Sequence, residues 1–226
     1  MSPISRPAHS VLAQRPEWAE AVARLRELAN ARRQESAADA QGYVARYAGG
    51  RGAMVLDVVA SRQRKYVERV LPMVERWKAR VSAPTLEALV ATPTSLEELG
   101  LRTAEPVTIV TVAQNLLSYG AQAGLDDEDE ICRRWADGTE GLEHGYELDP
   151  VVGEVSGIGL ALFSYMRMRA GASAIKPDVR VRRALRDLGF HVPRGEHAIL
   201  TVARAAAAET GMDLLTFDQL LWHVGR

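Results

Sequence analysis

The residues best suited to chemistry lie between Val152 and Arg183. A Gly157-Ile158-Gly159 turn stands between two apolar segments, and Asp178 begins a basic segment further along. Glycine lets the backbone turn tightly, and the N–H groups that begin the following helix favour a phosphate. A fixed carboxylate can stabilise a developing positive charge or orient a water molecule. The stretch therefore predicts a turn suited to a phosphate, followed by a carboxylate, Asp178, at the start of a basic helix.

Each of these residues also has a structural interpretation. A glycine turn between helices is an ordinary packing loop, and Asp178 stands where a helix N-cap is expected. Arg183, in the basic segment, is equally a candidate for a contact with a phosphate and for an ion pair inside the fold. Lys176, two residues before Asp178, is a candidate for an unorthodox amine nucleophile. The sequence leaves these alternatives open.

The turn, the aspartate and the arginine together resemble the helix-hairpin-helix and Gly-Pro-Asp element of the endonuclease III superfamily of DNA glycosylases. The resemblance is strongest over 152–190 and extends over about 53–226, where the last residues, 217–226, resemble the helix that follows the catalytic one. Three positions depart from the family pattern: Ser156 replaces a usual proline, Phe163 a frequent alanine, and Ala161 the lysine of strand-cleaving members. Without that lysine no Schiff base can form at this position. The resemblance therefore implies a monofunctional glycosylase that hydrolyses the base–sugar bond of a flipped, damaged or modified base.

The resemblance also implies which residues touch DNA. Asp178 takes the catalytic role, and Gln63 fills the gap left by the flipped base. The residues expected to bind the DNA backbone are Gly157, Gly159, Leu160, Ala161, Lys176, Arg180, Arg183, Arg62 and Arg64. The possible stacking walls for the base are Tyr66, Tyr165 and Trp222, each of which is otherwise a core residue. The stretch from Arg62 to Tyr66 is otherwise a solvated basic helix face.

The composition limits the functions open to the chain. Its 226 residues are 47% hydrophobic, enough for one core or for two small lobes that share one. The formal net charge is −1, so contact with nucleic acid must come from local basic patches. The single cysteine, Cys132, excludes an intrachain disulfide and a four-cysteine iron–sulfur cluster. We expect no metal site and no cofactor, apart from a monovalent cation at the hairpin carbonyls.

Apolar residues recur at helical spacing almost throughout, so we expect an all-α fold. The family pattern divides it into two lobes, with a helix-hairpin-helix motif between them. Lobe A covers about 53–174 and includes the hairpin at 149–170, and lobe B combines about 1–52 with 175–226. The expected helices include 36–48, a long segment at 53–81, and a short one near 149–155 before the turn. The cleft between the lobes is expected to hold the extruded base, with Asp178 at its mouth.

The expected partner is double-stranded DNA. We expect the protein to be a monomer that is located in the cytoplasm and associated with the nucleoid. We expect no membrane contact, because no apolar run approaches the length of a transmembrane helix. The chief alternative is a DNA-binding protein that keeps the hairpin and has lost the chemistry. A helical regulatory protein without a DNA role is the third interpretation.

Overall fold

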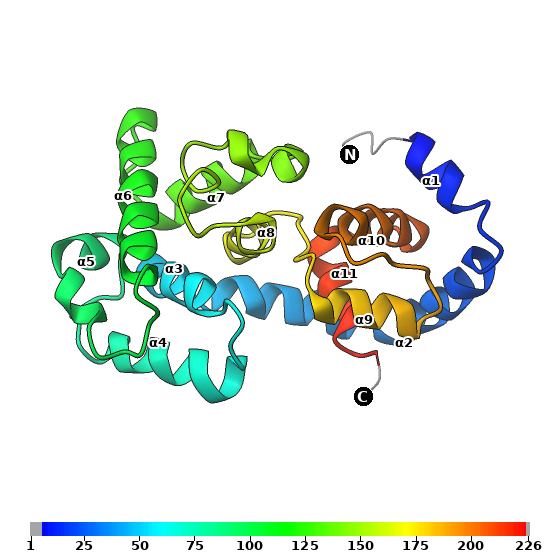
Figure 1. The fold of residues 1–226 in the computed structure, drawn as a ribbon, viewed down its shortest axis with the longest axis horizontal. Coiled ribbons are helices and arrows are strands. Elements are labelled where there is room, and N and C mark those ends of the chain that lie inside the picture. The colour runs from blue at the N-terminus through cyan, green and yellow to red at the C-terminus, as the bar shows by residue number, and fades with distance from the viewer. Residues whose placement is uncertain (1–5, 225–226) are drawn as a thin grey trace. The chain divides into compact units, whose positions relative to one another are not determined.

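The structure, a computed structural model, describes residues 6–224, and within this range the chain is all helical (Figure 1). The eleven α-helices of the described residues are α1 (Arg6–Leu12), α2 (Trp18–Ala45), α3 (Arg51–Ala60), α4 (Leu71–Lys78), α5 (Leu86–Ala91), α6 (Glu105–Ala123), α7 (Glu128–Gly138), α8 (Leu160–Arg169), α9 (Val179–Asp187), α10 (Glu196–Thr210) and α11 (Leu214–Leu221). A π-helix, η1 (Tyr66–Val70), runs directly into α4, and three short 3₁₀ helices complete the order: η2 (Pro93–Leu96), η3 (Leu142–His144) and η4 (Tyr146–Leu148). The predicted all-α class is confirmed.

The chain divides into two compact units. Unit 1 combines Met1–Tyr43 with Ser173–Arg226, and unit 2 is Val44–Ala172. The lobes expected from the sequence had their boundaries near 52 and 174. Residues 1–5 and the Gly225-Arg226 end of the predicted final helix lie outside the described residues.

Unit 1 is built around α9, α10 and α11, which pack on one another and enclose a core with the first part of α2. On α9 the buried side chains are Val181, Ala184 and Leu185, while Arg183 and Arg186 are exposed. This spacing is that of an amphipathic helix, with one stripe toward the core. The predicted inward face of this helix, Val181, Leu185 and Leu188, is confirmed.

Unit 2 surrounds α3, in which every residue is buried. Helices α4, α5, α6 and α8 all pack against it. A helix buried on all sides must be apolar or must pair each of its polar groups. Its apolar residues satisfy the first condition. Its two charged residues satisfy the second: Arg51 pairs with Asp129 at 2.5 Å, and Asp57 makes the contacts described below.

Two predicted helices differ from the structure. The predicted helix at 36–48 is the end of α2, which continues without a break, and the predicted segment at 53–81 is interrupted at 61–65 and contains η1. The interruption has a local cause, because Gln63 has a φ of +53°, outside the helical region.

The short helix predicted near 149–155 is wrong, because 151–157 is a run of turns and bends. Asp149 Oδ2 accepts hydrogen bonds from the backbone N–H groups of Val152 and Gly153, both at 2.9 Å. Those bonds compete with helical ones. A Cβ at Gly153 would lie 1.8 Å from the carbonyl oxygen of Tyr146, so only glycine fits this turn. The element before α8 is therefore not the first helix of a helix-hairpin-helix motif.

No helix among the described residues is both long enough and apolar enough to span a lipid bilayer.

Candidate nucleic-acid interface

The turn at 156–159 leads into α8 and is held against α6 by one side chain. The Thr108 hydroxyl lies 2.8 Å from the carbonyl oxygen of Ser156, to which it donates a hydrogen bond. Gly157 has a φ of +93°, and a Cβ there would lie 2.9 Å from Thr108 Oγ1. Both the backbone conformation and the packing therefore require glycine at 157.

The start of α8 presents backbone N–H groups that no side chain caps. The N-cap residue Gly159 is extended, and a Cβ there would meet no atom within 4 Å. The first N–H groups of a helix have no intrahelical partner and carry its partial positive charge. Leu160 is only 2% exposed, so at this position only the backbone could contact a ligand.

The monovalent cation expected at the hairpin stays a prediction. Such an ion would need carbonyl oxygens of the turn. The carbonyl of Val155 accepts a hydrogen bond from Ile158 N at 3.0 Å, and that of Ser156 accepts one from Thr108. Two of these oxygens are therefore already engaged, and no cation takes part in the reaction proposed below.

Asp178 caps α9 through one of its two carboxylate oxygens. Oδ1 accepts hydrogen bonds from the backbone N–H groups of Arg180 and Val181, at 2.9 and 3.0 Å. Oδ2 lies 3.9 Å from Lys176 Nζ, and the Asp178 side chain is 25% exposed. The capping role weighed from the sequence is thus present. The carboxylate is nevertheless held in one direction and reached by solvent, as a catalytic group requires.

The two arginines expected to bind DNA on α9 have different surroundings. Arg180 Nη2 lies 3.0 Å from both carboxylate oxygens of the buried Asp218, and its guanidinium lies 3.9 Å above the centre of the Trp222 ring. Burial raises the pKa of Asp218, and the adjacent Arg180 opposes that shift. Arg183 is exposed and forms no ion pair within residues 6–224. Arg183 therefore has the more accessible charge, whereas Arg180 holds α9 to α11.

Tyr66 and Tyr165 meet at a carboxylate that the sequence analysis did not identify. Asp57 is fully buried, and its Oδ2 accepts hydrogen bonds from the hydroxyls of Tyr47 and Tyr66, at 2.5 and 2.8 Å. Its Oδ1 accepts one from Tyr165 at 3.1 Å. Arg169 completes this Asp57 cluster, with Nη2 3.3 Å from Asp57 Oδ2 and 2.8 Å from the Tyr66 hydroxyl.

The Asp57 cluster pairs two of the buried charged groups of unit 2, Asp57 and Arg169. Burial raises the pKa values of Tyr47 and Tyr66, and the neighbouring Asp57 carboxylate raises them further. Both hydroxyls therefore remain protonated and can donate hydrogen bonds. A signal for this cluster exists in the sequence, because Asp57 stands inside the apolar run 53–60. A carboxylate there needs a buried cation or several donors. The hydroxyls of Tyr66 and Tyr165, the two tyrosines predicted to stack on the base, both donate to this carboxylate.

The predicted Arg62–Gln63–Arg64 stretch lies between α3 and η1 in unit 2. Arg64 is largely buried, and its guanidinium donates to both Glu105 carboxylate oxygens at 2.8 Å. Arg62 and Gln63 are exposed. Gln63 accepts a hydrogen bond from Arg102 at 3.4 Å. The charge of Arg64 is therefore compensated within the fold, whereas the Arg62 and Gln63 side chains are exposed and accessible to a partner.

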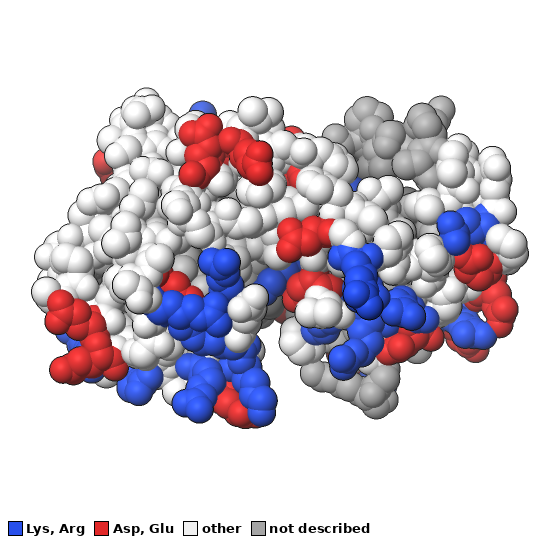
Figure 2. Space-filling view, in the orientation of Figure 1, with Lys and Arg blue, Asp and Glu red and all other residues white. Residues whose placement is uncertain are grey.

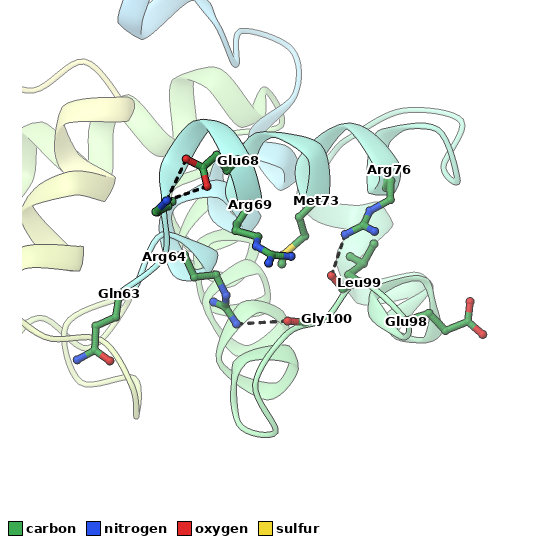
Figure 3. A pocket seen from close by; sticks show the side chains of 10 residues that line it. Gln63, Arg64, Glu68, Arg69, Met73, Arg76, Glu98, Leu99 and Gly100 are labelled. Atoms are coloured by element: carbon green, nitrogen blue, oxygen red, sulfur yellow. Dashed lines mark hydrogen bonds and ion pairs between the residues drawn. The ribbon is translucent and has the colours of Figure 1, made fainter.

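Basic side chains gather over η1 and α4 in unit 2 and over α9 in unit 1 (Figure 2). A cavity of about 630 Å³ lies beside η1 and α4, with Gln63 and Arg64 on its wall (Figure 3). The described residues contain no group of three or more side chains arranged to hold a metal ion.

Comparison of the chain with protein-family models, with curated proteins and with solved structures finds no match.

Proposed function

We propose that this protein is a monofunctional DNA glycosylase that hydrolyses the N-glycosidic bond of a damaged or modified base. The observation that supports this best is the geometry of Asp178. Its carboxylate is fixed by two backbone hydrogen bonds and remains 25% exposed at the start of a basic helix. A carboxylate that is both oriented and accessible can act on a positive charge that develops at a substrate.

In the proposed reaction, the bond between C1′ of the sugar and the base nitrogen breaks, and its electron pair leaves with the base. The sugar becomes an oxocarbenium-like cation, which the Asp178 carboxylate stabilises. A water molecule then attacks C1′ and loses a proton, for which Asp178 is the proposed base, and the departing base nitrogen takes up a proton from solvent. The products are a free base and an abasic site. Ala161 supplies no amine, so no Schiff base forms at this position and the proposed reaction ends at the abasic site.

The backbone N–H groups at the start of α8 are proposed to hold a DNA phosphate. Helix N-termini bind phosphates through their unpaired amides and partial positive charge, without reading the base sequence. The open space around Gly159 supports this role, because nothing within 4 Å blocks an approaching group. Extruding a base costs a few kcal/mol of stacking and pairing. The exposed Gln63 is proposed to offset part of that cost by filling the gap.

A panel of duplexes that each carry one altered base tests the proposal. The panel includes uracil, alkylated purines and mismatched adenine, and each duplex is incubated with the protein and then divided. We expect strand breaks at one or more lesions only in the half treated with alkali, since an abasic site breaks on heating with base. Breaks without alkali would contradict a monofunctional mechanism. The absence of breaks across a broad panel would contradict the enzyme proposal.

The second candidate function is a DNA-binding protein without catalysis. The observation in its favour is that capping alone accounts for the position of Asp178. Such a protein would bind duplex DNA with a steep dependence on salt and excise nothing. Binding without excision on the same panel would support this candidate over the enzyme.

A further inference from the structure

Three unusual backbone features of unit 2 adjoin the cavity beside η1 and α4. Within residues 6–224, the non-glycine residues with a left-handed φ are Gln63, at +53°, and Glu98, at +63°. Both line this cavity, and so do Glu68 and Arg69 of the π-helix η1. Left-handed φ values and π-helices are unfavourable and concentrate at functional sites. Their convergence on one cavity points to a binding site.

The cavity contains positive charge that the fold does not neutralise. The Arg69 side chain extends toward its centre beside Met73 (Figure 3), and its guanidinium forms no hydrogen bond or ion pair within the described residues. The Arg76 guanidinium donates one hydrogen bond, to the carbonyl oxygen of Leu99 at 3.1 Å, and forms no ion pair with any residue of 6–224. That bond holds its guanidinium at the cavity wall and leaves its remaining donors available.

The acidic residues of the wall do not cancel these two charges. Glu68 pairs with Lys65 at 3.1 Å. The Glu98 side chain points away from the cavity (Figure 3). Its carboxylate lies 3.6 Å from the Arg80 guanidinium. Two arginines therefore face the cavity with open donors. Planar guanidinium groups match the oxygens of a phosphate through paired hydrogen bonds.

We propose that this cavity binds a phosphodiester group of the backbone of duplex DNA, through Arg69 and Arg76. The lining contains no aromatic ring on which a base could stack, so a free nucleotide has little to recognise beyond its phosphate. The buried Met73 side chain gives the floor an apolar surface that suits a sugar. The proposal rests on the proposed function, since it assigns the DNA partner a second contact in unit 2 beside Gln63.

Salt-dependent binding of a fluorescently labelled, undamaged duplex tests the proposal. The variants are Arg69→Ala and Arg76→Ala, and the matched control is Arg134→Ala on α7, an exposed arginine of unit 2 without an ion pair among the described residues. Each phosphate contact contributes about 0.9 to the slope of log affinity against log salt. Between about 50 and 200 mM salt, each cavity variant should therefore lose roughly 3.5-fold less affinity than the wild type. The control should follow the wild-type curve.

Several outcomes separate this proposal from the proposed function. If the wild type binds and excises while both cavity variants keep its salt slope, the cavity proposal is wrong and the glycosylase proposal stands. If the cavity variants flatten the slope but no lesion is excised, the cavity proposal stands and the enzyme proposal fails. If inorganic phosphate raises the melting temperature of the wild type but not of Arg69→Ala, and the salt slopes are equal, the ligand is free phosphate and the DNA assignment is overturned. Circular dichroism of each variant shows that it is folded.

Discussion

Substitution of Asp178 can separate its capping role from its proposed catalytic role. Asparagine is as good an N-cap as aspartate, so Asp178→Asn keeps an oxygen that can accept from Arg180 N and Val181 N. The change removes the negative charge and the ion pair with Lys176, whose atoms are 3.9 Å apart. Partly exposed pairs of this kind contribute about 0–1 kcal/mol. Asp178→Ala removes the cap as well, at a cost of about 1 kcal/mol.

These values translate into measurable shifts. For a chain of this size, 1 kcal/mol corresponds to roughly 2–4 °C in melting temperature. We expect Asp178→Asn to melt within about 2 °C of the wild type, and Asp178→Ala to melt a few degrees lower. Loss of a group that stabilises transition-state charge costs about 10²–10³ in rate. Both variants should therefore lose excision by at least about 100-fold in single-turnover assays at saturating protein.

A second capping aspartate provides the control. Asp213 caps α11 in the same unit, where its Oδ1 accepts a hydrogen bond from Thr216 N at 3.0 Å. Asp213→Ala should lower the melting temperature to a similar extent without loss of excision. If Asp178→Asn excises like the wild type, or if the activities of all variants follow their stabilities, Asp178 is only a cap and the catalytic reasoning is refuted.

Three further predictions concern the fold around the proposed sites. Gly157→Ala should destabilise unit 2 by about 1–2 kcal/mol in urea unfolding, because φ is +93° and the new Cβ would lie 2.9 Å from a threonine hydroxyl on α6. The control Gly159→Ala places its Cβ in open space and should cost less free energy of unfolding. Asp57→Ala should cost about 3–5 kcal/mol, since it leaves the buried Arg169 guanidinium without its carboxylate, and a loss below about 1 kcal/mol would show that the cluster contributes little. Burial opposes ionisation of Glu209, but hydrogen bonds from Trp18 and His9 outweigh it and lower its pKa. The stability from this group is complete above its unfolded-state pKa and is lost as the pH falls through the folded value, so Glu209→Gln should flatten the acid side of the pH–stability curve, and an unchanged curve would contradict this assignment.

The parts of the fold that depend on near neighbours in the sequence were predictable. The all-α class and the inward face of α9 follow from apolar spacing. The capping role of Asp178 follows from its position after Lys176-Pro177, because a cap involves only N–H groups two or three residues ahead. The absence of an amine at 161 was likewise visible directly.

Other features required the tertiary structure. The run at 149–155 has apolar residues suited to a helix, yet Asp149 captures the N–H groups that a helix would use, and Gly153 packs against Tyr146. The sequence also did not show that Arg64 and Arg69, five positions apart, have different surroundings. The charge of Arg64 is compensated by Glu105, which lies 41 positions away in the chain, whereas the Arg69 guanidinium has no carboxylate partner in the part of the chain that the structure describes.

The sequence by itself determined the helical class, the inward stripe of α9, the glycines of the turn and the chemical character of Asp178. Only the tertiary structure decided which charges are compensated, that Asp57 is surrounded by three tyrosines and an arginine, and that Gln63, η1 and Arg69 adjoin one cavity. The physical reason is the separation along the chain over which each kind of interaction acts. Helical periodicity and capping act over a few residues, whereas the bond from Tyr165 to Asp57 joins residues 108 positions apart.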